Sequence, residues 1–191
     1  MPVQIGAKSH HFTDPTGLLS DCHRRIEMFL GTLQAVAEVI DRPATDDVAQ
    51  ALETALRYFS QAAPKHTADE EESLFPRLRQ VANPEVTTAL SRLDALEEEH
   101  RRADPLHADM EQLGVKYLSV KSIPSHEVER FRAAIRDLRA MYERHIGVED
   151  SIIFPLAALL LSEQDRSAIA DEMAGRRNVK LFGIGDALHG F

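Results

Sequence analysis

The sequence contains no tryptophan, a single cysteine and few aromatic residues, and it has no excess of basic residues. One cysteine, Cys22, cannot form an internal disulfide, which excludes a disulfide-stabilised secreted domain and favours a reducing cytoplasm. The 22 Lys and Arg residues are outnumbered by 31 Asp and Glu residues and form no basic stripe, so a nucleic-acid-binding surface is not expected. The longest apolar run, PLAALLL at 155–161, is too short to span a bilayer, and the segment MPVQIGAKSHHF lacks the pattern of a secretion signal.

Residues that favour helices dominate the rest of the chain, and apolar residues recur at helical spacing. Asp14-Pro15 and Asn83-Pro84 each pair a capping residue with a proline suited to a first helical turn. Pro64 is expected to interrupt its helix just before His66. The predicted helices cover about 15–41, 45–82, 83–113 and 125–161, with a connection at 114–124 and a short helix at about 162–175 that begins at a capping box.

No segment shows the alternation typical of a strand, so the predicted class is all-α. The simplest arrangement is an antiparallel (up-down-up-down) four-helix bundle with a short fifth C-terminal helix. A chain of 191 residues is long enough for one well-packed domain. We therefore expect a single domain over 1–191, with its bundle core at about 15–161. The tail at 176–191 has no predicted structure, but its KLFGIG stretch is apolar enough to cover a homodimer surface.

One pattern occurs twice in the chain. The stretches HTADEEESLFP at 66–76 and HIGVEDSIIFP at 145–155 each contain a His, a Glu four places later, a second acid at the next place and a closing Phe-Pro. The tripeptide His-Arg-Arg precedes both stretches, at 23–25 and at 100–102. The chain therefore looks like two helix hairpins of similar design.

The HxxxE spacing places both side chains on one face of a helix. Leu74 and Leu78 lie on the face of His66 and Glu70, which predicts that this face points into the bundle. An unpaired ionised Glu in an apolar core is very unfavourable, and a divalent or trivalent cation would neutralise it. Nitrogen and oxygen ligands without thiolate suit iron or manganese, and zinc is a further candidate.

The candidate metal ligands are four His and two Glu residues: His23, His66, Glu70, His100, His145 and Glu149. Each of two ions would take two imidazoles and share two bridging carboxylates, which leaves at least one position per ion for solvent or a small ligand. A single HxxxE pair is more often a helix-surface pair, and a single core His is more often simply hydrogen-bonded. The agreement of both halves in order and spacing is what favours a metal site.

Other acids near these positions are weaker candidates for metal ligands. Glu27 and Asp104 lie four places after the two HRR histidines and are interpreted as groups that orient imidazole or pair with Arg, in preference to direct ligands. Glu71 and Asp150 are the alternative ligands if the register is off by one residue. The acids at 97–99 are predicted to form a solvent-facing surface.

The remaining candidate side chains are assigned to structural roles or left out of the site. Cys22 is predicted to be a small buried residue. His107 shares a face with His100 but lies too far along the helix axis to reach the same ion. The two Phe-Pro pairs are expected to pack and to shape their helices. Four further histidines fall in predicted loop or terminal segments and are poor candidates: His10, His11, His126 and His189.

With this pattern assembled, the chain resembles the hemerythrin-like HHE cation-binding family over roughly residues 15–160. The resemblance implies a bundle that holds a non-haem di-iron centre, with two iron ions joined by an oxo or hydroxo group and with Glu70 and Glu149 as bridges. Oxygen-carrying hemerythrins place a further His four residues after the position of His100, where this chain has Asp104. The set is therefore more similar to family members linked to iron-centre repair, nitric oxide stress, and iron or oxygen sensing, although the repair proteins usually carry an additional Cys-containing segment.

The resemblance implies a cytoplasmic protein that binds, senses or reacts with dioxygen, nitric oxide or peroxide, in a stress response and without a nucleic-acid or membrane partner. An alternative is an iron- or metal-dependent regulatory or storage protein without turnover. A third reading is a purely structural zinc bundle. The sequence leaves open whether the protein is an enzyme, which small ligand it binds and whether it forms a homodimer.

Overall fold

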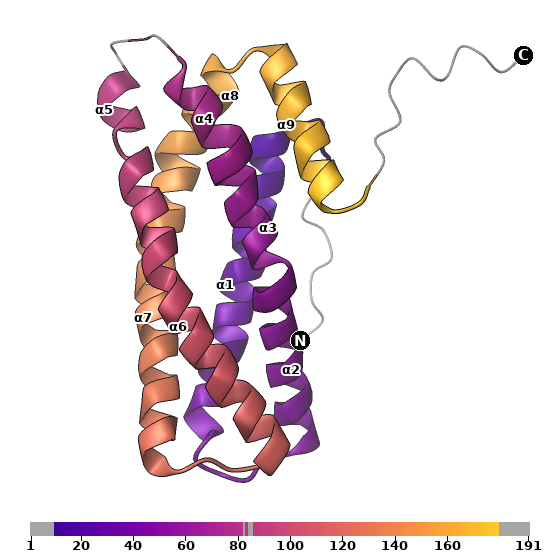
Figure 1. Ribbon diagram of the computed structural model, residues 1–191, viewed down its shortest axis with the longest axis vertical. Coiled ribbons are helices and arrows are strands. Elements are labelled where there is room, and N and C mark those ends of the chain that lie inside the picture. Colours follow the sequence, from indigo (N-terminus) through magenta and orange to yellow (C-terminus); the bar gives the residue numbers. More distant parts are fainter. Residues whose placement is uncertain (1–9, 82, 84–85, 180–191) are drawn as a thin grey trace, which may run out of the picture.

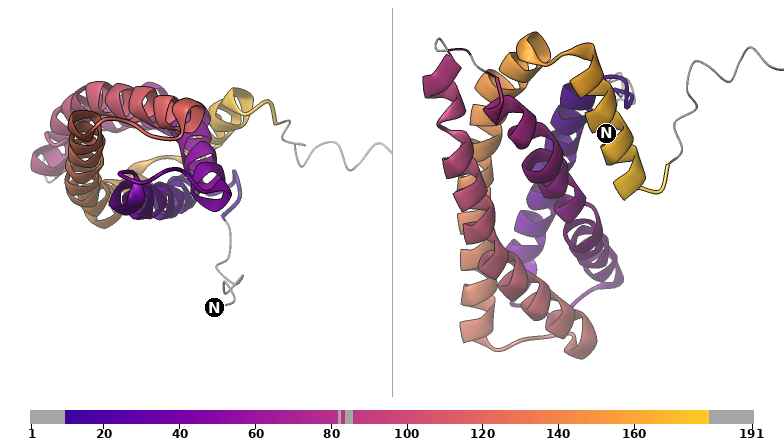
Figure 2. Two further views of the ribbon diagram at one scale, coloured as in Figure 1. Left: turned by 90° about the horizontal axis from the view of Figure 1, so that it is seen from below. Right: turned by 45° about the horizontal axis from the view of Figure 1, so that its top comes forward.

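The structure is a computed structural model that describes residues 10–81, 83 and 86–179, and it contains helices and no strand within these ranges. Four long helical segments lie side by side, and a shorter helix packs outside them near one end (Figure 1). Each long segment contacts two others, in the cyclic order α1, α2, α6 and α7. Seen along the long axis, they surround a common interior (Figure 2). The predicted all-helical class is confirmed.

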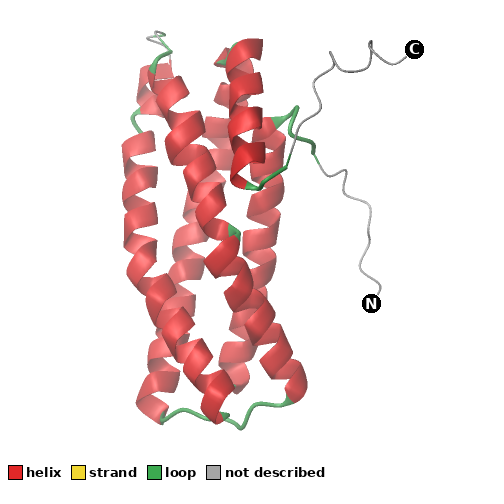
Figure 3. Ribbon diagram, turned by 45° about the vertical axis from the view of Figure 1, so that its right-hand side comes forward, coloured by secondary structure: helices red, strands yellow, loops and turns green. Residues whose placement is uncertain are grey.

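Only the first long segment is a single uninterrupted α-helix. The second and fourth segments each contain a π-helical turn, and the third begins with a separate short helix. Figure 3 shows these segments as helix joined by short loops. The first segment is α1 (Pro15–Val39), and the second consists of α2 (Asp46–Gln61), α3 (Ala63–Ala68), η1 (Asp69–Leu74) and α4 (Phe75–Arg79). The third consists of α5 (Thr87–Leu90) and α6 (Leu93–Val120), the fourth of α7 (Ser125–Val148), η3 (Glu149–Ile153) and α8 (Phe154–Leu160), and α9 (Glu163–Arg176) follows.

Two predicted helix starts carry the expected caps. The Asp14 carboxylate accepts a hydrogen bond of 3.0 Å from the amide of Gly17, and Pro15 is the first residue of α1. Before α9, the hydroxyl of Ser162 accepts from the amide of Asp165 at 3.1 Å, while the Asp165 carboxylate accepts from the amide of Ser162 at 3.3 Å. This is the predicted capping box, and it satisfies amides that have no partner within the helix.

The predicted connection at 114–124 is wrong in its first part, because α6 continues to Val120. Gly114 is buried inside this helix, where a side chain would lie 2.9 Å from the Leu56 side chain of α2. The glycine therefore allows a close approach of two helices and does not mark a turn. The helix ends at Lys121, whose φ of 64° is left-handed.

The predicted start of the third helix also differs from the structure. It begins with α5 at Thr87, and α6 follows only at Leu93. The Asn83-Pro84 pair was expected to open this helix, but Pro84 lies outside the described residues. The apolar tail at 180–191 lies outside them as well.

The apolar core divides into two clusters along the bundle. One cluster includes Leu33, Leu52, Phe131 and Leu138. The other includes Leu19, Leu74, Leu78 and Leu161. In α1, His23 lies between Leu19 of one cluster and Ile26 of the other, and in α6 His100 lies between Leu96 and Ala103 in the same way. These two buried histidines therefore lie between two apolar layers.

Both ends of the bundle are closed by specific contacts. At one end, the amide of Ala44 donates to the carbonyl of Lys121 at 3.0 Å, which joins the α1–α2 and α6–α7 connections. At the other end, α9 lies against η1 and α1 (Figure 2). There the Arg77 guanidinium makes two hydrogen bonds to Glu172, of 3.0 and 2.7 Å. None of the helices within the described ranges has the length and apolar character needed to cross a membrane.

Candidate metal centre

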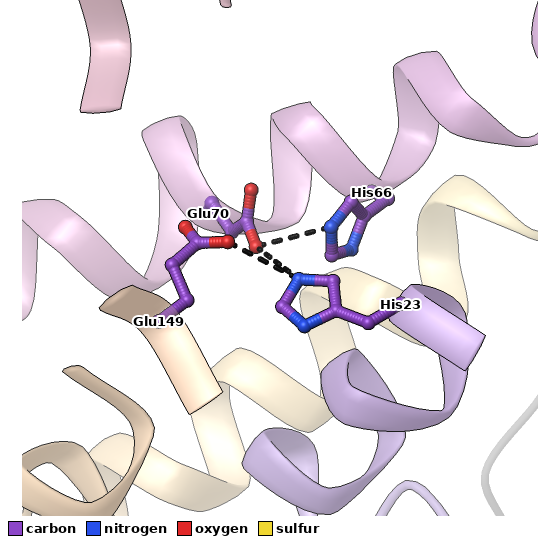
Figure 4. A group of neighbouring side chains, drawn as sticks. All are labelled: His23, His66, Glu70 and Glu149. Atoms are coloured by element: carbon purple, nitrogen blue, oxygen red, sulfur yellow. Dashed lines mark ion pairs between the residues drawn. The ribbon is translucent and has the colours of Figure 1, made fainter. Parts of the chain in front are cut away.

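The structure brings all six candidate ligands together in the interior, between the two apolar clusters. Each is at least nine-tenths buried, and the four segments contribute at least one residue each: His23, His66, Glu70, His100, His145 and Glu149. Figure 4 shows four of them, with both carboxylates and the His23 and His66 rings pointing toward one another. The helical spacing and the order of the repeat therefore predicted which polar side chains meet.

The π-helical turns η1 and η3 begin at or next to the two glutamates. The amide of Phe75 donates to the carbonyl of Glu70, and the amide of Phe154 donates to that of Glu149, which are i→i+5 bonds. A proline follows each Phe, and because proline has no N–H it cannot continue the ordinary hydrogen-bond ladder. A π turn inserts one extra residue and is frequent at functional sites. Both Phe-Pro pairs were expected to shape their helices, and a π turn ends directly before each pair.

One half of the site is formed by His23 and His66 with the two carboxylates. The Nε2 atom of His66 lies 3.2 Å from Oε1 of Glu70, and that of His23 lies 3.1 Å from Oε2 of Glu149. The two imidazole rings meet edge to face, with their centroids 4.9 Å apart. One potential ligand atom from each of the four residues lies within 4.8 Å of the others, which is close enough for a single ion to contact all four.

The other half is formed by His100 and His145 with the same two carboxylates. The Nε2 atoms of the two imidazoles are 3.0 Å apart, and Nε2 of His145 lies 3.2 Å from Oε2 of Glu149. The Nε2 atom of His100 lies 3.5 Å from Oε2 of Glu70, the oxygen that the first half does not use. These four residues again offer ligand atoms within 4.8 Å of one another. Glu70 and Glu149 therefore belong to both groups, as bridging carboxylates would.

The carboxylates are buried with imidazole nitrogens 3.1 to 3.8 Å from their oxygens, but these contacts do not have the geometry of hydrogen bonds. None of the four oxygens of Glu70 and Glu149 has a hydrogen-bond partner among the described residues, and both side chains are 0% exposed. Burial and the neighbouring charge of Glu149 raise the pKa of Glu70 to about 8. Buried charges are normally paired or coordinate metals, so these orphaned oxygens fit a cation held between the histidines.

Comparison with known proteins agrees with this geometry. The family model described as hemerythrin HHE cation binding domain matches residues 14–157 of the chain. The chain belongs to the hemerythrin family. It is also 30% identical over 175 residues to an uncharacterized protein of Haemophilus influenzae, across 88% of this chain and 93% of that protein. The matched region contains all six candidate metal ligands, and the family binds metal cations.

Three imidazoles of this hemerythrin domain are held from outside by acids. The Nδ1 atoms of His23, His100 and His145 lie 2.9 Å from Asp150, 2.7 Å from Glu71 and 3.0 Å from Glu99, respectively. An Nδ1–H that donates to a carboxylate leaves the Nε2 lone pair facing the interior, which is the tautomer that a metal requires. In contrast, Nδ1 of His66 is buried and has no partner among the described residues.

These contacts decide between the roles predicted for the surrounding acids. Glu27 takes the predicted pairing with Arg, because its carboxylate lies 2.8 Å from Arg24, and Asp104 is exposed. Glu71 comes directly after Glu70 and Asp150 directly after Glu149, each within a π turn. Each of these two acids contacts the Nδ1 atom of a histidine on another segment. Their position directly after each Glu was visible in the sequence, but the segment that they face was not.

The predicted solvent-facing surface at 97–99 is wrong for one residue. Glu99 reaches the buried His145. Glu97 and Glu98 are also partly exposed, but they pair with surface arginines. On a helix, three consecutive acids cannot all face the same way, so one of them turns toward α7.

One of the remaining expectations is wrong, because His126 lies in the first turn of α7 and not in a loop, although it belongs to neither group of candidate ligands. The others agree with the structure where it can be described. Cys22 is buried, and His107 lies outside both groups of candidate ligands, with its Nε2 atom 2.9 Å from the Tyr142 hydroxyl. The Phe154 ring of the second Phe-Pro pair stacks on the His23 imidazole, with centroids 5.1 Å apart. His189 lies outside the described residues.

Proposed function

We propose that this hemerythrin-family protein is an antiparallel four-helix bundle that holds two iron ions and binds or reacts with a small molecule such as dioxygen, nitric oxide or peroxide. The observation that supports it most strongly is the set of four carboxylate oxygens of Glu70 and Glu149, buried among four imidazoles and lacking hydrogen-bond partners among the described residues. A protein interior tolerates such a pair of acids when cations neutralise it.

The donor set and the family suit iron, with manganese or zinc as alternatives. His23 and His66 would hold one ion, His100 and His145 the other, and the two glutamates would bridge them. Imidazole nitrogen and carboxylate oxygen without thiolate suit iron or manganese. Two nitrogens and two shared carboxylates do not saturate an ion that accepts five or six ligands, so a redox metal here would supply an open position for a small ligand. The apolar layers on both sides exclude bulk water from that position.

A second candidate function is metal-dependent regulation or storage without turnover. The helix α9 is attached to η1, the turn that carries Glu70, through ion pairs from Arg176 and Arg177 to Asp69. Metal binding at Glu70 is thereby linked to the position of the C-terminal helix. Metal loss would then change the contacts of α9 with a partner.

The deciding experiment is metal analysis and an optical spectrum of protein purified without added metal. We expect about two irons per chain and a visible absorption that changes with nitric oxide or peroxide. A colourless zinc protein would indicate a structural site. Iron that shows no spectral response, together with a metal-dependent change in helicity or oligomeric state, would indicate the regulatory function.

Variants test whether the six residues hold the metal. Glu149→Ala and His66→Ala should each lose at least one iron per chain, because each removes a ligand that the rest of the site cannot replace. Glu143→Ala is the matched control, since Glu143 is exposed on the same segment as Glu149. Full iron retention in both site variants would contradict the assignment.

A further inference from the structure

A cavity of about 210 Å³ lies beside the candidate metal centre, between α3 and α6, with Tyr142 of α7 on its wall. Its inner wall includes the buried residues His100, Ala103 and Tyr142, and its outer part includes Thr67 and the exposed Asp104. The cavity therefore extends from the protein surface to the back of one candidate ligand.

The cavity reaches one half of the site in particular. It is lined by His100, whose Nε2 atom is 3.0 Å from that of His145, and by Tyr142, whose ring meets the His145 ring edge to face. Three other cavities are lined by none of the six candidate ligands. They have volumes of about 440 and 270 Å³ between α1 and α7 and about 550 Å³ between α2 and α6. A small molecule that enters the 210 Å³ cavity therefore arrives next to the His100–His145 half.

His107 and Tyr142 on the cavity wall form a polar pair in which one hydrogen-bond donor has no acceptor among the described residues. The Nε2 atom of His107 and the hydroxyl of Tyr142 are 2.9 Å apart, and Nδ1 of His107 is buried without a partner among the described residues. Burial lowers the pKa of His107 to about 4, so its imidazole is uncharged at neutral pH. A neutral imidazole carries one N–H.

Both tautomers of His107 leave one donor of the pair without an acceptor. If Nε2–H donates to the Tyr142 oxygen, the phenol O–H is free. If the phenol donates to Nε2, the N–H at Nδ1 is free. An unsatisfied buried donor is unfavourable, and an acceptor atom that enters the cavity would remove the penalty.

We propose that this cavity admits a small neutral ligand with a hydrogen-bond acceptor atom, such as hydrogen peroxide or dioxygen, to the His100–His145 half, and that the Tyr142–His107 pair donates a hydrogen bond to it. This inference rests on the proposed function. The negative charge of Asp104 at the outer part of the cavity disfavours anions, while Phe59 and Ala103 provide an apolar wall.

The test uses the iron-loaded full-length protein with hydrogen peroxide and azide as probes. Tyr142→Phe keeps the ring and removes the donor, so it should weaken azide binding in an optical titration about tenfold. Asp104→Asn should strengthen azide binding several-fold at low salt and leave the rate with uncharged peroxide unchanged, because only the anion is repelled.

A second variant tests the route. Ala103→Leu fills part of the cavity and should slow the spectral change with hydrogen peroxide, followed by stopped flow, about tenfold when entry becomes limiting. Ala140→Leu, an exposed alanine in the groove between α1 and α7, is the matched control and should behave as the wild type. All variants should keep the iron content and the resting spectrum of the wild type.

The outcomes separate this proposal from the proposed function. Iron-loaded Tyr142→Phe with wild-type azide affinity, together with a wild-type peroxide rate in Ala103→Leu, would overturn the cavity proposal and leave the metal centre intact. If Ala103→Leu does not fold, Tyr142→Phe and Asp104→Asn decide, because both keep the volume of the native side chain. Wild-type protein without a redox metal would overturn the proposed function and this proposal together.

Discussion

The Nδ1 atom of His23 lies 2.9 Å from Oδ1 of Asp150, although the two residues are 127 positions apart in the chain. The same Asp150 oxygen accepts a hydrogen bond of 2.9 Å from the Ser20 hydroxyl, and the second oxygen pairs with Arg24. The carboxylate is therefore held on three sides, and it holds the imidazole with Nε2 directed toward Glu149.

Asp150→Asn should weaken metal affinity by about 10- to 100-fold, the usual effect of removing a group that orients a ligand. The physical reason is that an amide no longer fixes the tautomer or raises the basicity of His23. Competition with a chelator measures the change. Glu27→Gln is the control, since Glu27 pairs with Arg24 and should leave affinity unchanged. Equal losses in the two variants would show that the interpretation of Asp150 is wrong.

The half of the site that contains His66 should release its metal first. Among the four candidate ligand histidines, His66 alone has an Nδ1 atom without a hydrogen-bond partner among the described residues. Its ring is therefore less firmly oriented. We expect metal removal by a chelator to proceed in two phases, with the fast phase absent in His66→Ala.

A matched variant tests the same physical cause in the other half. Glu99→Gln removes the acid that contacts Nδ1 of His145, so it should accelerate the slow phase of metal release. A single phase in the wild type, or a Glu99→Gln variant with an unchanged slow phase, would contradict the proposed difference between the halves.

Arg177→Ala should destabilise the protein by roughly 3 kcal/mol, measured by urea unfolding. Asp69 is 0% exposed, and its two oxygens lie 2.9 Å from Arg176 and 2.6 Å from Arg177. Removing one partner leaves a buried charge incompletely compensated. The double variant Asp69→Asn with Arg177→Ala should recover part of the loss, because the charge is then absent. A loss below about 0.5 kcal/mol in the single variant would mean that the pair behaves like a surface ion pair.

The stability of the protein should fall between pH 6.5 and pH 4 in part because of His107. Burial lowers its pKa from 6.5 to about 4, so over this range the unfolded chain binds a proton that the folded protein does not. The folded state is favoured fully above pH 6.5 and loses about 1.4 kcal/mol per pH unit as the pH falls toward 4.

A comparison of the wild type with His107→Gln isolates this effect from other titrating groups. The difference between their unfolding free energies should shrink by about 2 kcal/mol between pH 7 and pH 5, and it should be constant above pH 7.5. A difference that does not change with pH would show that His107 is as easily protonated in the folded protein as in the unfolded chain.

The amino-acid sequence by itself determined the helical class and the identity of the six polar residues that meet in the interior. Helical spacing places His66 and Glu70 on the apolar face of Leu74 and Leu78, and burying that face requires the polar side chains to enter the core as well. The repeat of this pattern in the second half of the chain predicted their partners. Local periodicity was sufficient because these residues are fixed by their own helix.

Only the tertiary structure decided what lies around those six residues. Glu99, Glu71 and Asp150 find their histidines on neighbouring segments, so their roles depend on how the helices are rotated against one another. Gly114 lies inside a helix instead of ending it, and its lack of a side chain leaves room for Leu56 of α2. The cavity beside His100 and the lack of a partner for Nδ1 of His66 among the described residues likewise depend on how the segments pack. The spacing along one helix carries no information about such packing.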